Sequence, residues 1–322
     1  MTRVCLTRHL PEPIMRRMAE LFDVVHPATD DRPLTTPELL KLADGAEVLV
    51  PSLSDAITAD VMQALPSLKL IANFGAGVDH IDLAHAHAHG IAVSNTPSVL
   101  TEDTADVAMA LILAVPRRLG EAAQEIRTQS WHGWSPMHLL GHRVNGKKLG
   151  IVGMGRIGQA VARRARGFGL EIHYHQRTQL HETVEQEFGA HYHGSLVGLL
   201  QQADIISLHC PHTLETHHLI GAEQFAFMKP ASYLINTARG SLIEEKALVH
   251  ALSSGQIAGA GLDVFERAPA VSEALRALPN TVLLPHVSSA TVESRIEMGE
   301  KVLINIRSFA DGNMPPDLVL AD

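Results

Sequence analysis

The sequence predicts an α/β protein made of two doubly wound parallel-sheet domains with a cleft between them. Its 322 residues exceed what a single core usually takes, so two domains are expected. Short apolar runs alternate with amphipathic stretches, which is typical of parallel strands joined by helices. This series occurs in the first third of the chain and again from Lys148 to about Pro285. The two halves therefore resemble two similar domains.

The first series of elements runs to residue 93 and is followed by a long helical stretch. Its apolar runs predict strands over residues 3–7, 46–51, 68–73 and 91–93. Amphipathic stretches predict helices over residues 13–21 and 58–65 and from His80 onward. One long periodic helix is expected over residues 101–126.

Composition and charge exclude several classes of function. A hydrophobic content of 46% with 19% charged residues describes an ordinary globular protein, and the net charge of −9 argues against nucleic acid or an anionic membrane as a partner. No apolar run reaches the roughly 20 residues of a membrane span. The N-terminus leads directly into a strand pattern without signal-peptide architecture, and two cysteines suit a reducing compartment. We therefore expect a cytoplasmic protein.

Twenty histidines raise the question of a metal site. His85, His87 and His89 are spaced two apart, and on a helix His85 and His89 share one face while His87 points elsewhere. No carboxylate or cysteine nearby completes a ligand set, and the run from His209 to His212 lacks a second ligand pair. We therefore predict a solvated helix end and no metal site.

A glycine-rich loop follows the first strand of the second series. The apolar run 148–152 leads into Gly153-Met154-Gly155-Arg156-Ile157-Gly158, and a helix pattern follows over residues 159–168. A G-x-G-x-x-G run needs this strand–loop–helix context to bind a dinucleotide. Gly153 makes the tight turn, Gly155 lets the backbone approach the pyrophosphate, and Gly158 lets the helix pack on the strand, as in Rossmann-like domains. The helix N-terminus offers N–H groups and a positive dipole to the phosphates, and Arg156 adds a charge.

The end of the next strand indicates which dinucleotide binds. An NAD site normally carries an acid there, which accepts the ribose 2′-hydroxyl. The predicted strand 171–175 instead ends in Gln176-Arg177-Thr178, with no acid. An arginine and a hydroxyl can bind a 2′-phosphate, so NADP(H) is the predicted preference. If Arg177 is only a solvated loop residue, NAD(H) can bind as well.

Three later segments place reactive side chains at the ends of strands. One apolar run ends in Thr237-Ala238-Arg239, a second in Asp263 and Glu266, and a third in His286. The carboxyl ends of parallel strands line the ligand crevice of such sheets, so these side chains can converge there. An arginine after a strand is often only an ion-pair partner, and a histidine can be a cap in the core. Taken alone, these residues leave a structural role open.

The order and spacing of these motifs resemble the D-2-hydroxyacid dehydrogenase family over essentially the whole chain. The missing acid after the second strand is most similar to the glyoxylate/hydroxypyruvate reductase branch. The resemblance implies reduction of small 2-oxo acids to 2-hydroxy acids by hydride transfer from NAD(P)H. The motifs that carry it are Asn73-Phe74-Gly75-Ala76-Gly77-Val78-Asp79, Asn95-Thr96-Pro97, Thr104-Ala105-Asp106, the glycine loop, His209-Cys210-Pro211, and the arginine and histidine segments.

The resemblance also implies roles for individual residues. Arg239 would bind the substrate carboxylate and polarise the keto group, and His286 would exchange a proton with the carbonyl oxygen. Backbone N–H groups of Ala76 and Gly77 would hold the carboxylate from the first domain, so that domain closure completes the site. The implied substrate residues are Leu53, Phe74, Ala76, Gly77, Trp134, Arg239 and His286. The implied cofactor residues are Thr104, Gly153, Gly155, Arg156, Ile157, Gly158, Gln176, Arg177, Thr178, Cys210, Pro211, Thr237, Ala238, Asp263, His286 and Ser288.

The chain path of the family implies a discontinuous substrate domain. It would comprise residues 1–97 with 291–322, and residues 98–290 would form the dinucleotide-binding domain. A homodimer is also implied, built around the segment near Trp131, with Trp134 near the substrate pocket of the partner subunit.

One position departs from the family pattern. The family has a glutamate, hydrogen-bonded to the catalytic histidine, just before the proline that follows Asp-Val-Phe, and here that position is Ala268. A carboxylate beside an imidazole fixes its orientation and favours its protonated form. We therefore expect His286 to be a weaker base with a looser orientation. Glu266, two residues earlier, is a candidate substitute.

Two alternative functions stay open. A dinucleotide-sensing, corepressor-like binding protein can use the same fold, and Ala268 is a reason to consider it, although Arg239 and His286 favour an enzyme. Within the enzyme class the alternative is a short-form phosphoglycerate dehydrogenase. It is less expected because the chain stops at Asp322 without a regulatory domain, although short forms exist.

Overall fold

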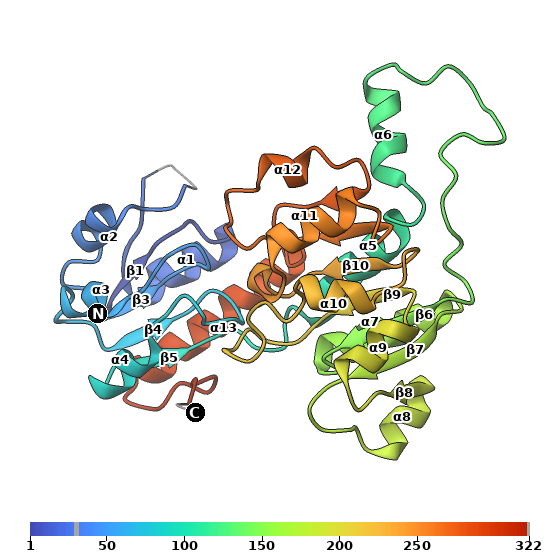
Figure 1. Ribbon diagram of the computed structural model, residues 1–322. Helices are drawn as coiled ribbons and strands as arrows, with labels where there is room; N and C mark the ends of the chain where they lie inside the picture. Colours follow the sequence, from blue (N-terminus) through green and yellow to red (C-terminus); the bar gives the residue numbers. More distant parts are fainter. Residues whose placement is uncertain (29–31, 321–322) are drawn as a thin grey trace. The chain divides into compact units, whose positions relative to one another are not determined.

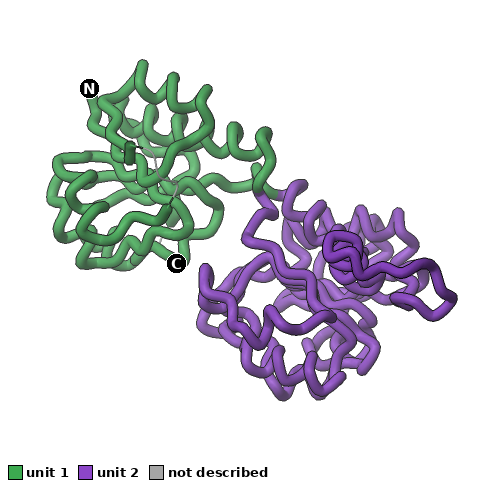
Figure 2. Tube along the Cα trace, turned by 90° about the horizontal axis from the view of Figure 1, so that it is seen from above, with its two compact units in different colours: residues 1–100, 290–322 green, residues 101–289 purple. Residues whose placement is uncertain are grey.

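The computed structural model describes residues 1–28 and 32–320 and divides into two compact units. Unit 1 comprises Met1–Leu100 and Ala290–Asp322, and unit 2 comprises Thr101–Ser289 (Figure 2). In the described residues each unit has one sheet, of five strands in unit 1 and seven in unit 2, and all strands in both sheets pair in parallel. The predicted α/β fold with two parallel-sheet domains is confirmed.

In unit 1 the strand order is β2-β1-β3-β4-β5. The elements are β1 (Arg3–Leu6), α1 (Glu12–Leu21), β2 (Asp23–Val25), α2 (Thr36–Leu42), β3 (Val48–Val50), α3 (Ala59–Gln63), β4 (Leu70–Ala72), α4 (Leu83–Ala88), β5 (Ala92–Ser94) and α13 (Val292–Ala310). Side chains of a strand alternate between the two faces of a sheet. Val4 and Leu6 of β1 accordingly join the apolar cluster under α1 and α13, and Cys5 joins the cluster under α2, α3 and α4. Helices therefore cover both faces, and α13 comes from a distant part of the sequence (Figure 1).

In unit 2 the strand order is β12-β11-β10-β9-β6-β7-β8. The elements are α5 (Thr101–Ala114), α6 (Leu119–Arg127), β6 (Lys148–Val152), α7 (Arg156–Gly167), β7 (Glu171–His175), α8 (Glu182–Phe188), β8 (Ala190–Tyr192), α9 (Leu196–Gln202), β9 (Ile205–Leu208), α10 (Ala222–Phe227), β10 (Tyr233–Asn236), the short helix η1 (Gly240–Leu242), α11 (Glu245–Ser253), β11 (Gly259–Leu262), α12 (Glu273–Arg276) and β12 (Thr281–Leu283). One apolar core lies under α5, α7 and α8, and the other lies under α9, α10 and α11. The chain runs outward from β6 to β8 and then returns to place β9 on the other side of β6. This reversal is the switch point at which such sheets bind ligands.

The prediction of a single helix over residues 101–126 is wrong. The segment forms two helices, since α5 ends at Ala114 and α6 begins at Leu119. Pro116 cannot donate a helical hydrogen bond and restricts the residue before it. Arg118 then takes a left-handed φ of 54°, and the His142 N–H donates to the Pro116 carbonyl at 2.8 Å. The proline and the returning loop thus break the helical pattern.

The histidines of α4 lie at a helix end. The His85 and His89 rings are stacked with centroids 3.9 Å apart, and Asp82 caps the helix by accepting from the His85 N–H at 2.9 Å. In the described part of the chain, no three His, Cys, Asp or Glu side chains lie close enough to hold a metal ion. No helix in the described residues of the chain is long and apolar enough to cross a membrane.

Candidate active site

The glycine loop joins β6 to α7, and each of its glycines has a separate steric reason. Gly153 has a φ of +95°, and a Cβ there would lie 2.7 Å from the Cys210 backbone nitrogen. A Cβ on Gly158 would lie 2.3 Å from the Gly153 carbonyl oxygen, so this glycine lets α7 approach the loop. A Cβ on Gly155 would meet nothing within 4 Å. Gly155 precedes the first residue of α7, so the space beside it and the helix N–H groups fit a pyrophosphate.

A cavity of about 500 Å³ lies beside this loop in unit 2. Seven of the residues predicted for the cofactor line it: Gly153, Gly155, Gln176, Arg177, Thr178, Cys210 and Pro211. Seven further lining residues were not predicted: Val152, His175, His209, Thr213, Glu215, Thr216 and Leu219. Four of these seven, from Thr213 to Leu219, lie in the segment just after the His209-Cys210-Pro211 motif. The motif therefore located the beginning of this side of the cavity but not the residues that continue it.

Gln176 connects the two loops at this cavity. Its Oε1 accepts from the Met154 N–H at 3.0 Å, and its Nε2 donates to the Thr178 carbonyl at 2.7 Å. Both ends of the amide are therefore used in holding the glycine loop against the loop after β7. Of the three residues predicted to recognise the 2′-phosphate, Gln176 is thus already hydrogen-bonded, and Arg177 and Thr178 are the two that can bind it.

Glu215 brings an acid into the same cavity from a different loop. Its carboxylate accepts from the Thr213 hydroxyl at 2.7 Å. This hydrogen bond and, more weakly, the charge of Arg177 hold the pKa of Glu215 below its usual range. The cavity therefore contains both a cation and an anion at neutral pH, which sequence reasoning about the end of β7 alone did not predict.

The end of β9 forms an uncharged wall of the cavity. Burial lowers the pKa of His209 to about 4, and the His209 Nε2 lies 2.8 Å from the Ser207 hydroxyl. Burial also raises the pKa of the Cys210 thiol to about 11. Both side chains are neutral near pH 7, so this wall adds no charge beside the phosphates.

The turn after β10 is fixed by a buried asparagine. The Asn236 side chain donates to the Arg239 carbonyl at 2.8 Å and accepts from the Ala238 N–H at 3.0 Å. Between them, the Thr237 hydroxyl is buried and has no hydrogen-bond partner among the described residues. A buried hydroxyl without a partner is costly unless a ligand or water satisfies it. It therefore fits a polar group of a bound cofactor.

Asp263, at the end of β11, holds the segment that carries His286. One carboxylate oxygen accepts from the Val287 N–H at 2.8 Å and the other from the Ser288 N–H at 2.9 Å. The Asp263 carbonyl also accepts from the His286 N–H at 2.9 Å. His286 has a left-handed φ of 57°, a conformation that needs such support. In this structure Asp263 thus positions the histidine backbone.

The strand order brings the predicted residues of unit 2 to one edge of the sheet. Because all these strands are parallel, their carboxyl ends lie at the same edge. From β12 to β7, that edge carries in turn His286, Asp263, Arg239, Cys210, Gly153 and Arg177. Of the remaining predicted residues, Arg156, Ile157 and Gly158 form the first turn of α7, Ser288 is buried beyond β12, and Thr104 is buried in α5.

Glu266 is engaged away from the His286 segment. One carboxylate oxygen lies 2.8 Å from the His218 Nε2, and the other accepts from the Glu245 N–H at 3.0 Å. Although burial opposes it, these two hydrogen bonds lower the pKa of Glu266. Its two oxygens therefore serve the start of α11 and His218, which weakens the argument that it replaces the glutamate missing at Ala268.

In unit 1 the predicted substrate residues lie at the carboxyl ends of β3 and β4. The turn Gly75-Ala76-Gly77 follows β4, and its carbonyls accept from the side chains of two asparagines. The Asn73 amide donates to the Gly75 and Gly77 carbonyls, each at 2.9 Å, and Asn95 donates to the Ala76 carbonyl at 2.7 Å. Phe74 is buried beside this turn. Trp134 belongs to unit 2 and is 82% exposed on the loop after α6.

The glycine loop, the adjoining cavity and the row of residues at one sheet edge define a dinucleotide-binding oxidoreductase domain. Residues 109–288 match the sequence model of the D-isomer specific 2-hydroxyacid dehydrogenase NAD binding domain. The chain is 45% identical to a glyoxylate reductase from Thermococcus litoralis over 99% of its own length and 97% of that protein's. The solved structure of a glyoxylate reductase from Paecilomyes thermophila is 37% identical, with a TM-score of 0.86 over 99% of this chain and 98% of that one.

The NADPH-dependent glyoxylate/hydroxypyruvate reductase SmGhrB from Sinorhizobium meliloti, solved with NADP and malonate, is also 37% identical. Its TM-score is 0.85, over 99% of this chain and 96% of that one. The chain therefore belongs to the D-isomer specific 2-hydroxyacid dehydrogenase family and is a nicotinamide dinucleotide-dependent oxidoreductase. The resemblance drawn from the sequence motifs is confirmed.

Proposed function

We propose that the protein reduces small 2-oxo acids to 2-hydroxy acids with hydride from NAD(P)H, with glyoxylate as first substrate and hydroxypyruvate as second. The observation that carries the proposal is that Arg239 and His286 lie at the same edge of the unit 2 sheet as the glycine loop. The names of relatives at 37–45% identity support it. Steady-state oxidation of NADPH with glyoxylate, hydroxypyruvate and pyruvate tests it directly.

The proposed roles follow from the chemistry of each group. The Arg239 guanidinium binds the substrate carboxylate and polarises the keto oxygen, and His286 donates a proton to that oxygen as hydride arrives at the carbon. The N–H groups of Ala76 and Gly77 hold the carboxylate, in a turn whose shape is fixed by asparagine side chains that donate to its carbonyls. The cofactor, when bound, supplies the hydride.

We propose a preference for NADPH over NADH. Support comes from Arg177 and Thr178 at the cavity, from the lack of an acid at the end of β7, and from the NADPH dependence of SmGhrB. Glu215 limits the preference because its carboxylate repels a 2′-phosphate and can accept a 2′-hydroxyl. The ratio of kcat/KM for the two cofactors should favour NADPH in the wild type and fall toward NADH in Arg177→Ala. A wild-type preference for NADH contradicts the proposal.

We also propose a homodimer built through the segment that carries Trp131 and Trp134. The two side chains are 51% and 82% exposed, which is unusual for tryptophan unless a partner covers them. Light scattering should give twice the mass of the chain, and Trp134→Ala should raise the KM for glyoxylate if the residue reaches the partner's substrate. A monomer with full activity contradicts this arrangement.

The alternative of a dinucleotide-sensing protein keeps one observation in its favour, which is that Ala268 lacks a carboxylate and Glu266 is engaged elsewhere. The two functions separate cleanly in one experiment. Tight NADPH binding without turnover of any 2-oxo acid favours sensing, and sustained turnover favours the reductase.

A further inference from the structure

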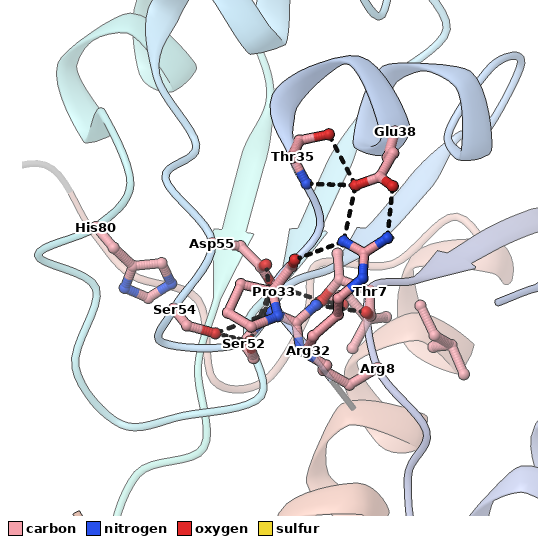
Figure 3. A network of polar contacts seen from close by, with 12 residues as sticks. Thr7, Arg8, Arg32, Pro33, Thr35, Glu38, Ser52, Ser54, Asp55 and His80 are labelled. Atoms are coloured by element: carbon pink, nitrogen blue, oxygen red, sulfur yellow. Dashed lines mark hydrogen bonds and ion pairs between the residues drawn. The ribbon is translucent and has the colours of Figure 1, made fainter. Parts of the chain in front are cut away.

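A buried ion pair lies at the carboxyl ends of β1 and β3 in unit 1 (Figure 3). Arg8 follows β1, Asp55 lies in the loop after β3, and the two are 8% and 4% exposed. The Arg8 Nη2 lies 2.9 Å from the Asp55 Oδ1. Burying two charges is costly, and such a pair persists only where further hydrogen bonds satisfy both groups.

Those hydrogen bonds tie down most of the loop 52–55. The other carboxylate oxygen of Asp55 accepts from the Thr7 hydroxyl at 2.5 Å, the Ser52 N–H at 2.8 Å and the Ser52 hydroxyl at 2.9 Å. The Arg8 Nη2 also donates to the Ser54 hydroxyl at 2.9 Å. Three of the four loop residues therefore belong to one network of charge-assisted bonds, the stronger kind of hydrogen bond.

Leu53 is the remaining residue of the loop, and its side chain is directed onto the Gly75–Gly77 turn. A Cβ on Gly75 would lie 2.8 Å from the Leu53 Cδ2 and 3.3 Å from its Cγ. The Leu53 side chain thus packs so closely against Gly75 that no larger residue fits there. The turn beneath it is itself fixed, because Asn73 and Asn95 bond its three carbonyls.

We propose that Asp55 is a positioning residue, which holds Leu53 against the Gly75–Gly77 turn and so sets the size of the 2-oxo acid that the site accepts. The inference rests on the proposed function, in which this turn binds the substrate carboxylate. The substituent on the keto carbon lies next to the carboxylate in any 2-oxo acid. An apolar wall fixed beside the carboxylate site therefore admits glyoxylate and rejects acids with longer chains, and a wall that moves loses this selectivity.

Thr7→Val and Ser52→Ala test the proposal without leaving a charge unpaired. Each removes one hydroxyl donor to Asp55 and keeps the Arg8 pair. We expect the KM for glyoxylate to rise about fivefold in each, the scale of one lost hydrogen bond. The preference for glyoxylate over 2-oxobutyrate should narrow by a similar factor, while kcat at saturating glyoxylate and the KM for NADPH stay within about twofold.

Thr35→Val is the matched control. It also removes a threonine hydroxyl that donates to a carboxylate in unit 1, because Thr35 Oγ1 lies 2.7 Å from Glu38 Oε2. That pair is exposed and begins α2, and Glu38 also accepts from the Arg32 guanidinium (Figure 3). The control should leave the KM for glyoxylate and the substrate preference unchanged.

Three outcomes decide the question. A rise in the KM for glyoxylate with reduced chain-length preference in Thr7→Val or Ser52→Ala, and not in Thr35→Val, supports the positioning role. Unchanged constants in both variants, or equal changes in all three, overturn it while leaving the reductase function intact. If the wild type reduces no 2-oxo acid although it binds NADPH, the proposed function fails and this inference fails with it.

Discussion

Substitutions at Gly155, Gly158 and Gly167 distinguish glycines that the fold requires from glycines that the ligand requires. Gly155 immediately precedes α7, and the other two belong to that helix. Gly158→Ala places a methyl group 2.3 Å from the Gly153 carbonyl oxygen, about 1.1 Å inside the 3.4 Å at which ordinary contact begins. Gly155→Ala adds a methyl group that meets nothing within 4 Å. Gly167→Ala does the same at the exposed end of α7 and serves as the control.

The expected magnitudes differ because the three methyl groups meet different surroundings. Overpacking against backbone, as in Gly158→Ala, costs about 1–3 kcal/mol of folding free energy. For a unit of this size, a loss of about 2 kcal/mol lowers the Tm by roughly 4–8 °C. Gly155→Ala should leave the Tm of the ligand-free protein unchanged and weaken NADPH binding about tenfold or more, since the methyl group takes up space that fits the pyrophosphate. Gly167→Ala should raise the Tm slightly through helix propensity.

Thermal unfolding with and without NADPH, together with NADPH fluorescence titration, measures both quantities. Gly158→Ala should lose stability before any ligand is added, and Gly155→Ala should lose only the stabilisation that the cofactor provides. Wild-type stability in Gly158→Ala, or wild-type NADPH affinity in Gly155→Ala, would refute the assignment of these two glycines.

Three further predictions concern single side chains. Asp263→Asn replaces an acceptor of the Val287 and Ser288 N–H groups, so kcat with glyoxylate should fall about 10- to 100-fold through misplacement of His286; an unchanged kcat contradicts the positioning role. Ala268→Glu should extend glyoxylate reduction to higher pH, because a carboxylate beside His286 favours its protonated form, and an unaltered pH–rate profile removes that argument. Burial, with His193 and His191 nearby, lowers the pKa of His173 to about 4. The unfolded chain therefore binds an extra proton between about pH 6.5 and pH 4, and stability is lost as the pH falls through that window. Between pH 7 and pH 5 the Tm of His173→Gln should therefore fall less than that of the wild type. His132→Gln, at an exposed position, is the control and should follow the wild type.

The sheet around the glycine loop could be predicted closely from the sequence. The predicted strands 148–152 and 171–175 coincide with β6 and β7. The first is mainly a short apolar run, as is typical of a buried parallel strand. Helix boundaries were harder. No helix was predicted at α2, although Thr35 and Glu38 form a capping box there, and Pro116 was not recognised as the end of α5.

The side-chain partners in the site could not be predicted, because they depend on which strands become neighbours. Glu215 reaches the cavity only because β9 pairs with β6, more than 50 residues earlier in the chain. Glu266 follows β11 but bonds to His218, in the segment before α10. The motifs located the residues at the ends of the strands, and the pairing of the strands decided which of them meet.

Helix α13 has a consequence for the order in which the chain can fold during synthesis. Its residues Met298, Val302 and Ile306 complete one of the two apolar clusters of unit 1. The helix passes α1 so closely at Gly299 that a Cβ there would lie 2.5 Å from Ile14. The ribosome produces all of unit 2 between residue 100 and this helix, which takes roughly 10–40 s at about 5–20 residues per second. Unit 2 is continuous and can finish its core first. On the face of the unit 1 sheet that carries this cluster, α1 is made early, and the part that α13 covers stays exposed until α13 emerges. Nascent unit 1 therefore presents apolar surface to solvent for as long as unit 2 takes to be made.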